Sequence, residues 1–259
     1  MEITLKGLAI TVVSIYVFFC IYLYLSQKSM IYLPSHQDFY ECNGFKYYDK
    51  LFFNGTRFYI KNKSDNVIVV YHGNAGSACD LSNNLKKVLE ETDYSLVFVE
   101  YAGYSNDSYS PSIMLLKNDV ENIKAYLNIK NFKKVIVYGR SLGTALAAYQ
   151  SSISNVDKLI LVSPFTTFLD LIKSKYPIFP INYMLTERYD NVEYLKNFKN
   201  NILIIHGNKD IDVPYKFGKD LYNTLTTKNK EFITIPGKGH NDLENDDSFY
   251  KKIMEFINK

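Results

Sequence analysis

The sequence predicts an α/β protein with a mainly parallel sheet covered by helices on both faces. We expect a β-hairpin at its start, a small cap, and one membrane-spanning helix before it. Short apolar runs alternate with helical patterns, as in a buried parallel sheet. A length of 259 residues and a hydrophobic content of 47% suit one large domain.

The N-terminal stretch GLAITVVSIYVFFCIYLYL, residues 7–25, has no charge and no proline. As a helix rising about 1.5 Å per residue, it nearly covers the roughly 30 Å core of a bilayer. Bulky residues continue to its end, so we expect an uncleaved single-pass anchor rather than a signal peptide. Lysines on both sides leave its orientation open. We therefore expect a flank at 1–6, the anchor at 7–25, a juxtamembrane linker at 26–44 and one domain at 45–259.

Within this domain, Asn54-Gly55 between two β-forming runs predicts a hairpin over 52–60. The strand candidates that follow are 67–71, 95–101, 135–138, 159–162, 202–205 and 232–235. The helical candidates are 81–92, 112–127, 142–152, 215–226 and 247–258. Residues 165–199 are aromatic-rich and longer than a usual connection, so we expect a cap there rather than a single irregular helix.

Charge and cysteine content exclude several classes of protein. The formal net charge is only +3 and there is no basic arm, so nucleic acid is not an expected partner. The three cysteines have neither metal-binding nor redox-pair spacing. Because Cys20 lies in the anchor, a bridge between Cys42 and Cys79 is the only disulfide that the domain could form. We expect free thiols, and neither a metal nor an organic cofactor.

The motif Gly139-Arg140-Ser141-Leu142-Gly143 lies between a predicted strand and a predicted helix. This G-x-S-x-G sequence in that context predicts a sharp turn with an exposed serine hydroxyl at its corner. The flanking glycines leave room where strand and helix converge. The alternative is an ordinary short loop in an α/β domain, and the rest of the sequence has to decide between the two.

A nucleophilic serine needs a base and an orienting acid, which follow it in the order acid, then histidine. Only His240 lies beyond the last strand, so it is the candidate base. Asp210 and Asp212 both follow strand 202–205, and spacing alone does not separate them. We expect His206 to hold that turn in place.

The chemistry also needs two N–H groups that face the developing oxyanion. One should belong to Leu142, directly after the serine. The other should come from the turn His72-Gly73-Asn74-Ala75-Gly76, which follows an early strand and contains small residues.

From about residue 28 onward the chain resembles the single-pass membrane-anchored α/β-hydrolases related to the bud-emergence protein and to protein depalmitoylating hydrolases. The matching stretches are MIYLPS, YHGNAG, YAGYS, YGRSLGTALA, SPFTTFLDL, HGNKDIDVP and GKGHND. The resemblance implies the α/β-hydrolase fold, Asp210 as the acid and Asn74 as the second oxyanion residue. The family usually has arginine and a glycine-rich run after the tyrosine of YAGYS, where this chain has Ala102, Ser105, Asp107 and Tyr109. We expect that loop to border the site, so substrate preference does not transfer.

Together these features predict a serine hydrolase that cleaves an acyl ester or thioester near a membrane. Ser141, Asp210 and His240 would be catalytic, the N–H groups of Asn74 and Leu142 would bind the oxyanion, and Gly73, Gly139 and Gly143 would support the site. A small molecule, a lipid or an acylated protein could be the substrate. Two alternatives stay open: a serine peptidase of the aminopeptidase type, which the family also resembles, and an inactive membrane-tethered binding module.

Overall fold

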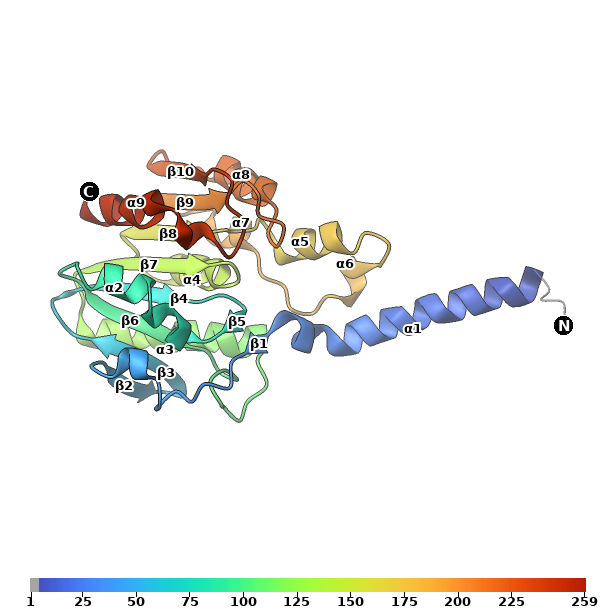
Figure 1. Cartoon of the computed structure of the whole chain (residues 1–259), viewed down its shortest axis with the longest axis horizontal. Coiled ribbons are helices and arrows are strands. Elements are labelled where there is room, and N and C mark those ends of the chain that lie inside the picture. Colours follow the sequence, from blue (N-terminus) through green and yellow to red (C-terminus); the bar gives the residue numbers. More distant parts are fainter. Residues whose placement is uncertain (1–4) are drawn as a thin grey trace.

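An eight-stranded β-sheet forms the centre of the domain, with the strand order β10-β9-β8-β7-β4-β6-β3-β2 (Figure 1). The computed structural model describes residues 5–259, so residues 1–4 of the expected flank lie outside the described part. Strands β4 to β10 of this sheet pair in parallel, whereas β2 and β3 pair antiparallel. The strands span Asp49–Phe53 (β2), Thr56–Lys61 (β3), Asn66–Tyr71 (β4), Ser95–Glu100 (β6), Lys134–Arg140 (β7), Lys158–Val162 (β8), Asn201–Gly207 (β9) and Lys230–Ile235 (β10).

The two antiparallel strands form the predicted hairpin. Asn54 and Gly55 both have positive φ angles, 48° and 95°. A two-residue hairpin turn of type I′ requires positive φ at both of its central residues. Each of the six predicted parallel strands is present, with every end within two residues of the expected position. The fold class predicted from the sequence is confirmed.

Side chains on alternate residues of the strands enter two separate hydrophobic cores. In β4, Val67, Val69 and Tyr71 belong to one core, and Ile68 and Val70 belong to the other. Both faces of the sheet are buried, which explains why these strands are apolar throughout rather than alternating.

Helices cover both faces of the sheet (Figure 1). Residues of α3 (Ile113–Lys130), α4 (Gly143–Ile153) and α8 (Tyr215–Thr224) fill the first core. Residues of α2 (Leu85–Leu89) and α9 (Asp247–Asn258) fill the second. Short 3₁₀ helices lie at Asn43–Phe45, Ala78–Ser82 and Leu243–Asn245. The helix expected over 81–92 is shorter than predicted, because its first part is one of these 3₁₀ turns.

The connection between β8 and β9 forms the expected cap. It contains α5 (Phe168–Lys175), α6 (Ile181–Met184) and α7 (Asn191–Leu195). The side-chain hydroxyl of Thr167 accepts a hydrogen bond from the Asp170 N–H and so begins α5. In Figure 1, α5 and α6 extend beyond the sheet toward the N-terminal helix.

That helix, α1 (Leu5–Ile31), is 27 residues long and projects from the domain like a rod (Figure 1). By length and composition it can cross a membrane, and its most apolar window is not buried in the protein. The segment 26–44, which we expect to link the anchor to the domain, is itself packed against the domain. It includes the end of α1 and the short strand β1 (Leu33–Pro34), which pairs with β5 (Ala75–Gly76). Tyr32 and Phe39 in this segment are buried.

The expectation of free thiols is wrong for two of the three cysteines. Cys42 and Cys79 form a disulfide, while Cys20 in α1 is free. The pair is 37 residues apart in sequence, and the packing of the 42–45 segment against the 78–82 turn brings its members together. Their spacing in the sequence does not reveal this proximity.

Candidate active site

Ser141 occupies the corner between β7 and α4. Its φ angle is +52°, a left-handed conformation that costs energy for a residue with a side chain. The flanking glycines explain how the turn closes. A Cβ atom on Gly139 would lie 2.3 Å from the Gly143 carbonyl oxygen, and one on Gly143 would lie 2.3 Å from the His72 carbonyl oxygen. The G-x-S-x-G sequence is therefore a steric requirement of this corner.

The turn after β4 lies beside this corner. A Cβ atom built on Gly73 would come within 3.8 Å of the Ser141 Cβ. Asn74 is held from three sides: its Nδ2 donates to the Ile31 carbonyl (2.9 Å), and its carbonyl accepts from the Leu33 N–H (2.9 Å) and the Tyr104 hydroxyl (2.7 Å). The N–H groups of Asn74 and Leu142 donate to no other group within residues 5–259. Both are available to a bound oxygen.

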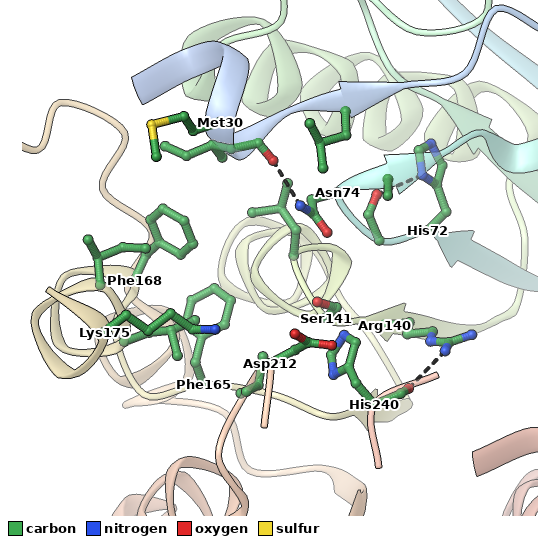
Figure 2. A pocket seen from close by; sticks show the side chains of 18 of the residues that line it. Met30, His72, Asn74, Arg140, Ser141, Phe165, Phe168, Lys175, Asp212 and His240 are labelled. Carbon is green, nitrogen blue, oxygen red and sulfur yellow. Dashed lines mark hydrogen bonds between the residues drawn. The ribbon is translucent and has the colours of Figure 1, made fainter. Parts of the chain in front are cut away.

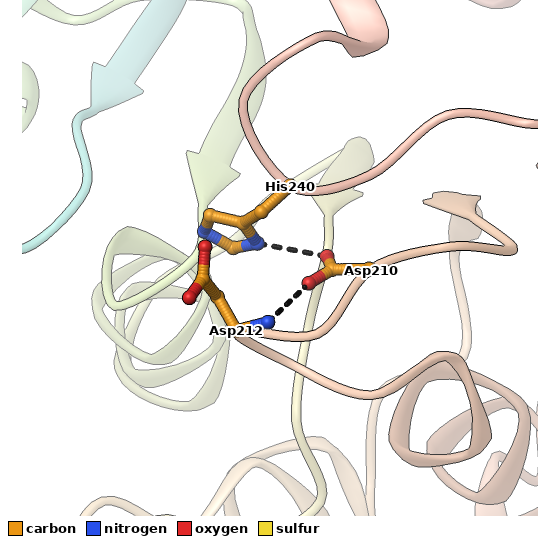
Figure 3. A group of neighbouring side chains, drawn as sticks. All are labelled: Asp210, Asp212 and His240. Carbon is orange, nitrogen blue, oxygen red and sulfur yellow. Dashed lines mark hydrogen bonds and ion pairs between the residues drawn. The ribbon is translucent and has the colours of Figure 1, made fainter.

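His240 and Asp210 are joined directly. His240 Nδ1 lies 2.8 Å from Asp210 Oδ2, and the Asp210 side chain is fully buried (Figure 3). Asp210 Oδ1 accepts from the N–H groups of Asp212 (3.0 Å) and Val213 (2.8 Å). Burial opposes ionisation of this carboxyl group. Hydrogen bonds from His206 and His240 outweigh that effect and hold the pKa of Asp210 well below its usual range.

The residues around this pair hold it in place. His206 Nε2 lies 2.8 Å from the Val213 carbonyl, so His206 holds the turn as expected. Arg140 donates to the His240 carbonyl (3.0 Å) and pairs with Glu244 (2.8 Å), which links the loop of His240 to the serine corner. The sequence did not predict this role for Arg140.

Asp212 has a different environment from Asp210. It is exposed, it lines the cavity, and its side chain accepts no hydrogen bond within residues 5–259. One ligand atom from each of Asp210, Asp212 and His240 lies within 4.8 Å of the others (Figure 3). Asp210 Oδ2 already accepts a hydrogen bond from His240 Nδ1–H, so neither of these two atoms is free for a metal while that bond is kept.

Ser141 and His240 open into one cavity of about 590 Å³. Figure 2 shows both side chains at its centre, with Asp212 beside them. No hydrogen bond joins Ser141 to His240 in the described part of the chain, so the structure brings them into one cavity without bonding them. Catalytic hydrogen bonds are often long in unliganded enzymes and shorten in the substrate complex.

The loop after Tyr101 does not line this cavity, contrary to the expectation that it borders the site. Its tyrosines support the site from behind instead. The Tyr101 hydroxyl donates to the His72 carbonyl (2.7 Å), and the Tyr101 ring stacks on His72 with 3.9 Å between centroids. Asp107 accepts from the Gly103 N–H within the loop itself. The departures from the family pattern therefore lie outside the cavity wall.

Much of the cavity wall was not predicted from the sequence. Cap residues including Phe165 and Phe168 line it, as do Leu23, Met30 and Ile31 from α1. The aromatic composition of 165–199 was a signal for the cap. For α1, the signal was Gln27, a polar residue two positions after the end of the apolar run 7–25.

The fold is that of the α/β hydrolases. A solved structure of MGS-M2, an α/β hydrolase enzyme from a deep-sea metagenome library, matches with a TM-score of 0.63 at 16% identity, covering 82% of this chain and 98% of that one. The chain belongs to the prolyl oligopeptidase family, whose sequence profile matches residues 129–259. The protein is thus an α/β hydrolase of that family.

Relatives in several organisms agree with this assignment. An uncharacterized protein of Mycobacterium tuberculosis is 27% identical over 180 residues, which cover 68% of this chain and 63% of the relative. The match thus spans less than two thirds of that relative's length. Protein bem46 of Schizosaccharomyces pombe is 26% identical over 198 residues, covering 73% and 66%. The bovine lysophosphatidylserine lipase ABHD12 is 29% identical over 182 residues, covering 62% and 46%. The resemblance inferred from the sequence motifs is confirmed.

Proposed function

We propose that this protein is a serine hydrolase that cleaves acyl esters or thioesters at a membrane through an acyl-enzyme intermediate. One observation carries the proposal: a serine at a strained strand-to-helix corner shares a cavity with a histidine whose Nδ1 is bonded to a buried carboxylate. The lipase name of one relative supports an acyl substrate. We assign the catalytic domain to 45–259 and the membrane anchor to 7–25.

In the proposed mechanism, Ser141 Oγ attacks the acyl carbonyl carbon and transfers its proton to His240 Nε2. Asp210 holds the proton on Nδ1 beforehand and stabilises the imidazolium that forms. The carbonyl oxygen becomes negative and accepts hydrogen bonds from the N–H groups of Asn74 and Leu142. The imidazolium then protonates the leaving group. Water attacks the acyl-serine by the same route and releases the carboxylic acid.

A peptidase of the aminopeptidase type is the second candidate. The family profile carries a peptidase name, and the exposed Asp212 carboxylate in the cavity could bind a substrate amine. The apolar wall formed by the cap and α1 favours an acyl chain over a peptide.

Labelling of the full chain with a fluorophosphonate probe tests the proposal. Ser141→Ala should abolish labelling and hydrolysis. Ser163→Ala is a matched control, because Ser163 also follows a strand with positive φ (51°) but is buried and outside the cavity. We expect Ser163→Ala to retain labelling. A panel of acyl esters, thioesters and aminoacyl amides then identifies the bond. Equal labelling of Ser141→Ala would refute the assignment, and cleavage of amides alone would favour the peptidase.

A further inference from the structure

One face of the anchor helix is turned toward the cap. Tyr16, Cys20, Leu23, Gln27 and Met30 follow one another at intervals of three or four residues, which places them along one side of α1. Cys20, Leu23 and Gln27 are partly buried, although the residues between them are mostly exposed. This face is therefore partly covered by protein, whereas most other residues of the helix are exposed.

The cap contacts this face along more than three helical turns. The Tyr16 hydroxyl donates to the Ile178 carbonyl (2.9 Å), and its ring stacks on Phe179 with centroids 5.7 Å apart. Gln27 Nε2 donates to the Met184 carbonyl (3.2 Å), and Gln27 Oε1 accepts from the Thr186 N–H (2.8 Å). The side chain of Gln27 thus pairs with backbone on both sides of α6's C-terminal end.

The end of α1 is also joined to the turn that would bind the oxyanion. The Ile31 carbonyl accepts from Asn74 Nδ2 (2.9 Å), and β1 pairs with β5 directly after that residue. The buried Tyr32 hydroxyl bonds to Glu187 and Tyr189 in the connection after α6. The anchor therefore continues into the domain through bonded, buried groups rather than through a free linker.

The cavity differs in character between its two ends. Toward α1 and the cap it is lined by Leu23, Met30, Ile31, Phe168, Leu171 and Met184. Beyond Ser141, the polar lining residues include Arg140 and its ion-pair partner Glu244. In Figure 2, Met30 and Phe168 lie on one side of Ser141, and Arg140 lies on the other. Lys175 at the end of α5 is exposed, so its ammonium group can reach water.

The apolar end of this cavity lies at the same level along α1 as the uncharged run that we propose as the membrane anchor. Leu23 lies within the uncharged run 7–25, and Tyr16, which touches the cap, lies about 13 Å deeper along the helix than Leu25. Beside Tyr16, the cap exposes Ile178 (73%), and further along it exposes Tyr183 (89%). Large exposed apolar side chains next to a membrane-spanning segment indicate a surface that faces lipid.

We propose that α1 is a wall of the acyl-binding site, and that the substrate is a membrane lipid ester whose long acyl chain enters from the bilayer between α1 and the cap. This inference rests on the proposed hydrolase function and specifies its substrate class. The chain lies against Leu23, Met30 and the cap, with the ester at Ser141. The leaving group faces Arg140 and Glu244, away from the membrane. The amphiphile thus keeps the orientation that it has in the bilayer.

The test compares two tryptophan variants of the full chain in detergent micelles. Leu23→Trp places bulk in the cavity, while Leu25→Trp is the matched control, because Leu25 is 74% exposed on another face of the same helix. The substrates are p-nitrophenyl esters from acetyl to palmitoyl. Each methylene group of the acyl chain that an apolar site no longer buries should lower kcat/KM about fourfold. If the tryptophan excludes two or more methylene groups, Leu23→Trp should hydrolyse the palmitoyl ester more than about tenfold more slowly than the wild type.

We expect the ratio of palmitoyl to acetyl ester hydrolysis to fall more than about tenfold in Leu23→Trp. Leu25→Trp should match the wild type on every ester. Labelling rates with a short-chain and a hexadecyl fluorophosphonate should show the same dependence on chain length. This measurement does not depend on hydrolysis of an acyl-enzyme. Identical chain-length profiles for the wild type and both variants would overturn the inference, and so would an equal loss on all esters by Leu23→Trp. Unaltered cleavage of a palmitoyl-thioester peptide by Leu23→Trp would also overturn it. If the wild type cleaves no ester at all, the proposed function itself fails.

Discussion

Replacing Asp210 by asparagine should nearly abolish turnover, and the hydrogen bonds around the side chain explain why. Oδ1 accepts from two backbone N–H groups, those of Asp212 and Val213. An asparagine at this position must direct its amide oxygen toward these two donors. Its NH₂ group then faces His240 Nδ1, where Asp210 Oδ2 now lies at 2.8 Å.

Because an NH₂ group donates, Nδ1 must become the acceptor and the ring proton moves to Nε2. A histidine protonated at Nε2 cannot remove the Ser141 proton. The variant also loses the negative charge that stabilises the imidazolium. In a comparable triad this change costs on the order of 10⁴ in kcat.

Asp212→Asn is the matched control, since it makes the same chemical change two residues away. The Asp212 N–H that bonds to Asp210 is retained, and its exposed carboxylate accepts no hydrogen bond within residues 5–259. A charge in such a position contributes little, so the loss should stay below about tenfold. Initial rates on a short p-nitrophenyl ester measure both variants, with circular dichroism to verify folding. The reverse ranking would assign the acid to Asp212, and two active variants would refute the catalytic assignment of Ser141, His240 and Asp210.

Three further predictions concern stability. Burial raises the pKa of Asp119 to about 7, so between about pH 4 and 7 the folded state keeps a proton that the unfolded chain has released. Thermal unfolding should therefore show that the free energy of unfolding falls as the pH rises through this window, by at most about 4 kcal/mol. Asp119→Asn should lack this pH-dependent component. Loss of the Cys42–Cys79 disulfide, which spans 37 residues, should lower the free energy of unfolding by about 4 kcal/mol. Cys20→Ser should leave the melting temperature unchanged, because Cys20 is free. Equal melting temperatures for the oxidised and reduced protein would contradict the disulfide. Gly143→Ala should lower the melting temperature and the activity, because its Cβ would lie 2.3 Å from the His72 carbonyl oxygen; Gly73→Ala, whose Cβ would meet nothing closer than 3.8 Å, should not lower the melting temperature.

Local patterns in the sequence were sufficient for the strands, most of the helices and the serine corner. Each depends on residues close together in the chain: Asn54-Gly55 permits a two-residue hairpin turn, and Gly139 and Gly143 permit the tight corner around Ser141. The chain order of acid and histidine then left few candidates, because only one histidine follows the last strand. Steric and hydrophobic constraints of this kind act within a few residues and are visible in the sequence.

The tertiary structure decided what depends on contacts between distant segments. It bonds Asp210 rather than Asp212 to His240, because the turn directs one carboxylate inward and leaves the other exposed. It brings Cys42 to Cys79, and it joins Gln27 to Met184, 157 residues away, so that α1 becomes part of the cavity wall. A hydrophobic run looks the same in sequence whether lipid surrounds it or a cap covers one face. Only the packing of the cap against α1 distinguishes these cases.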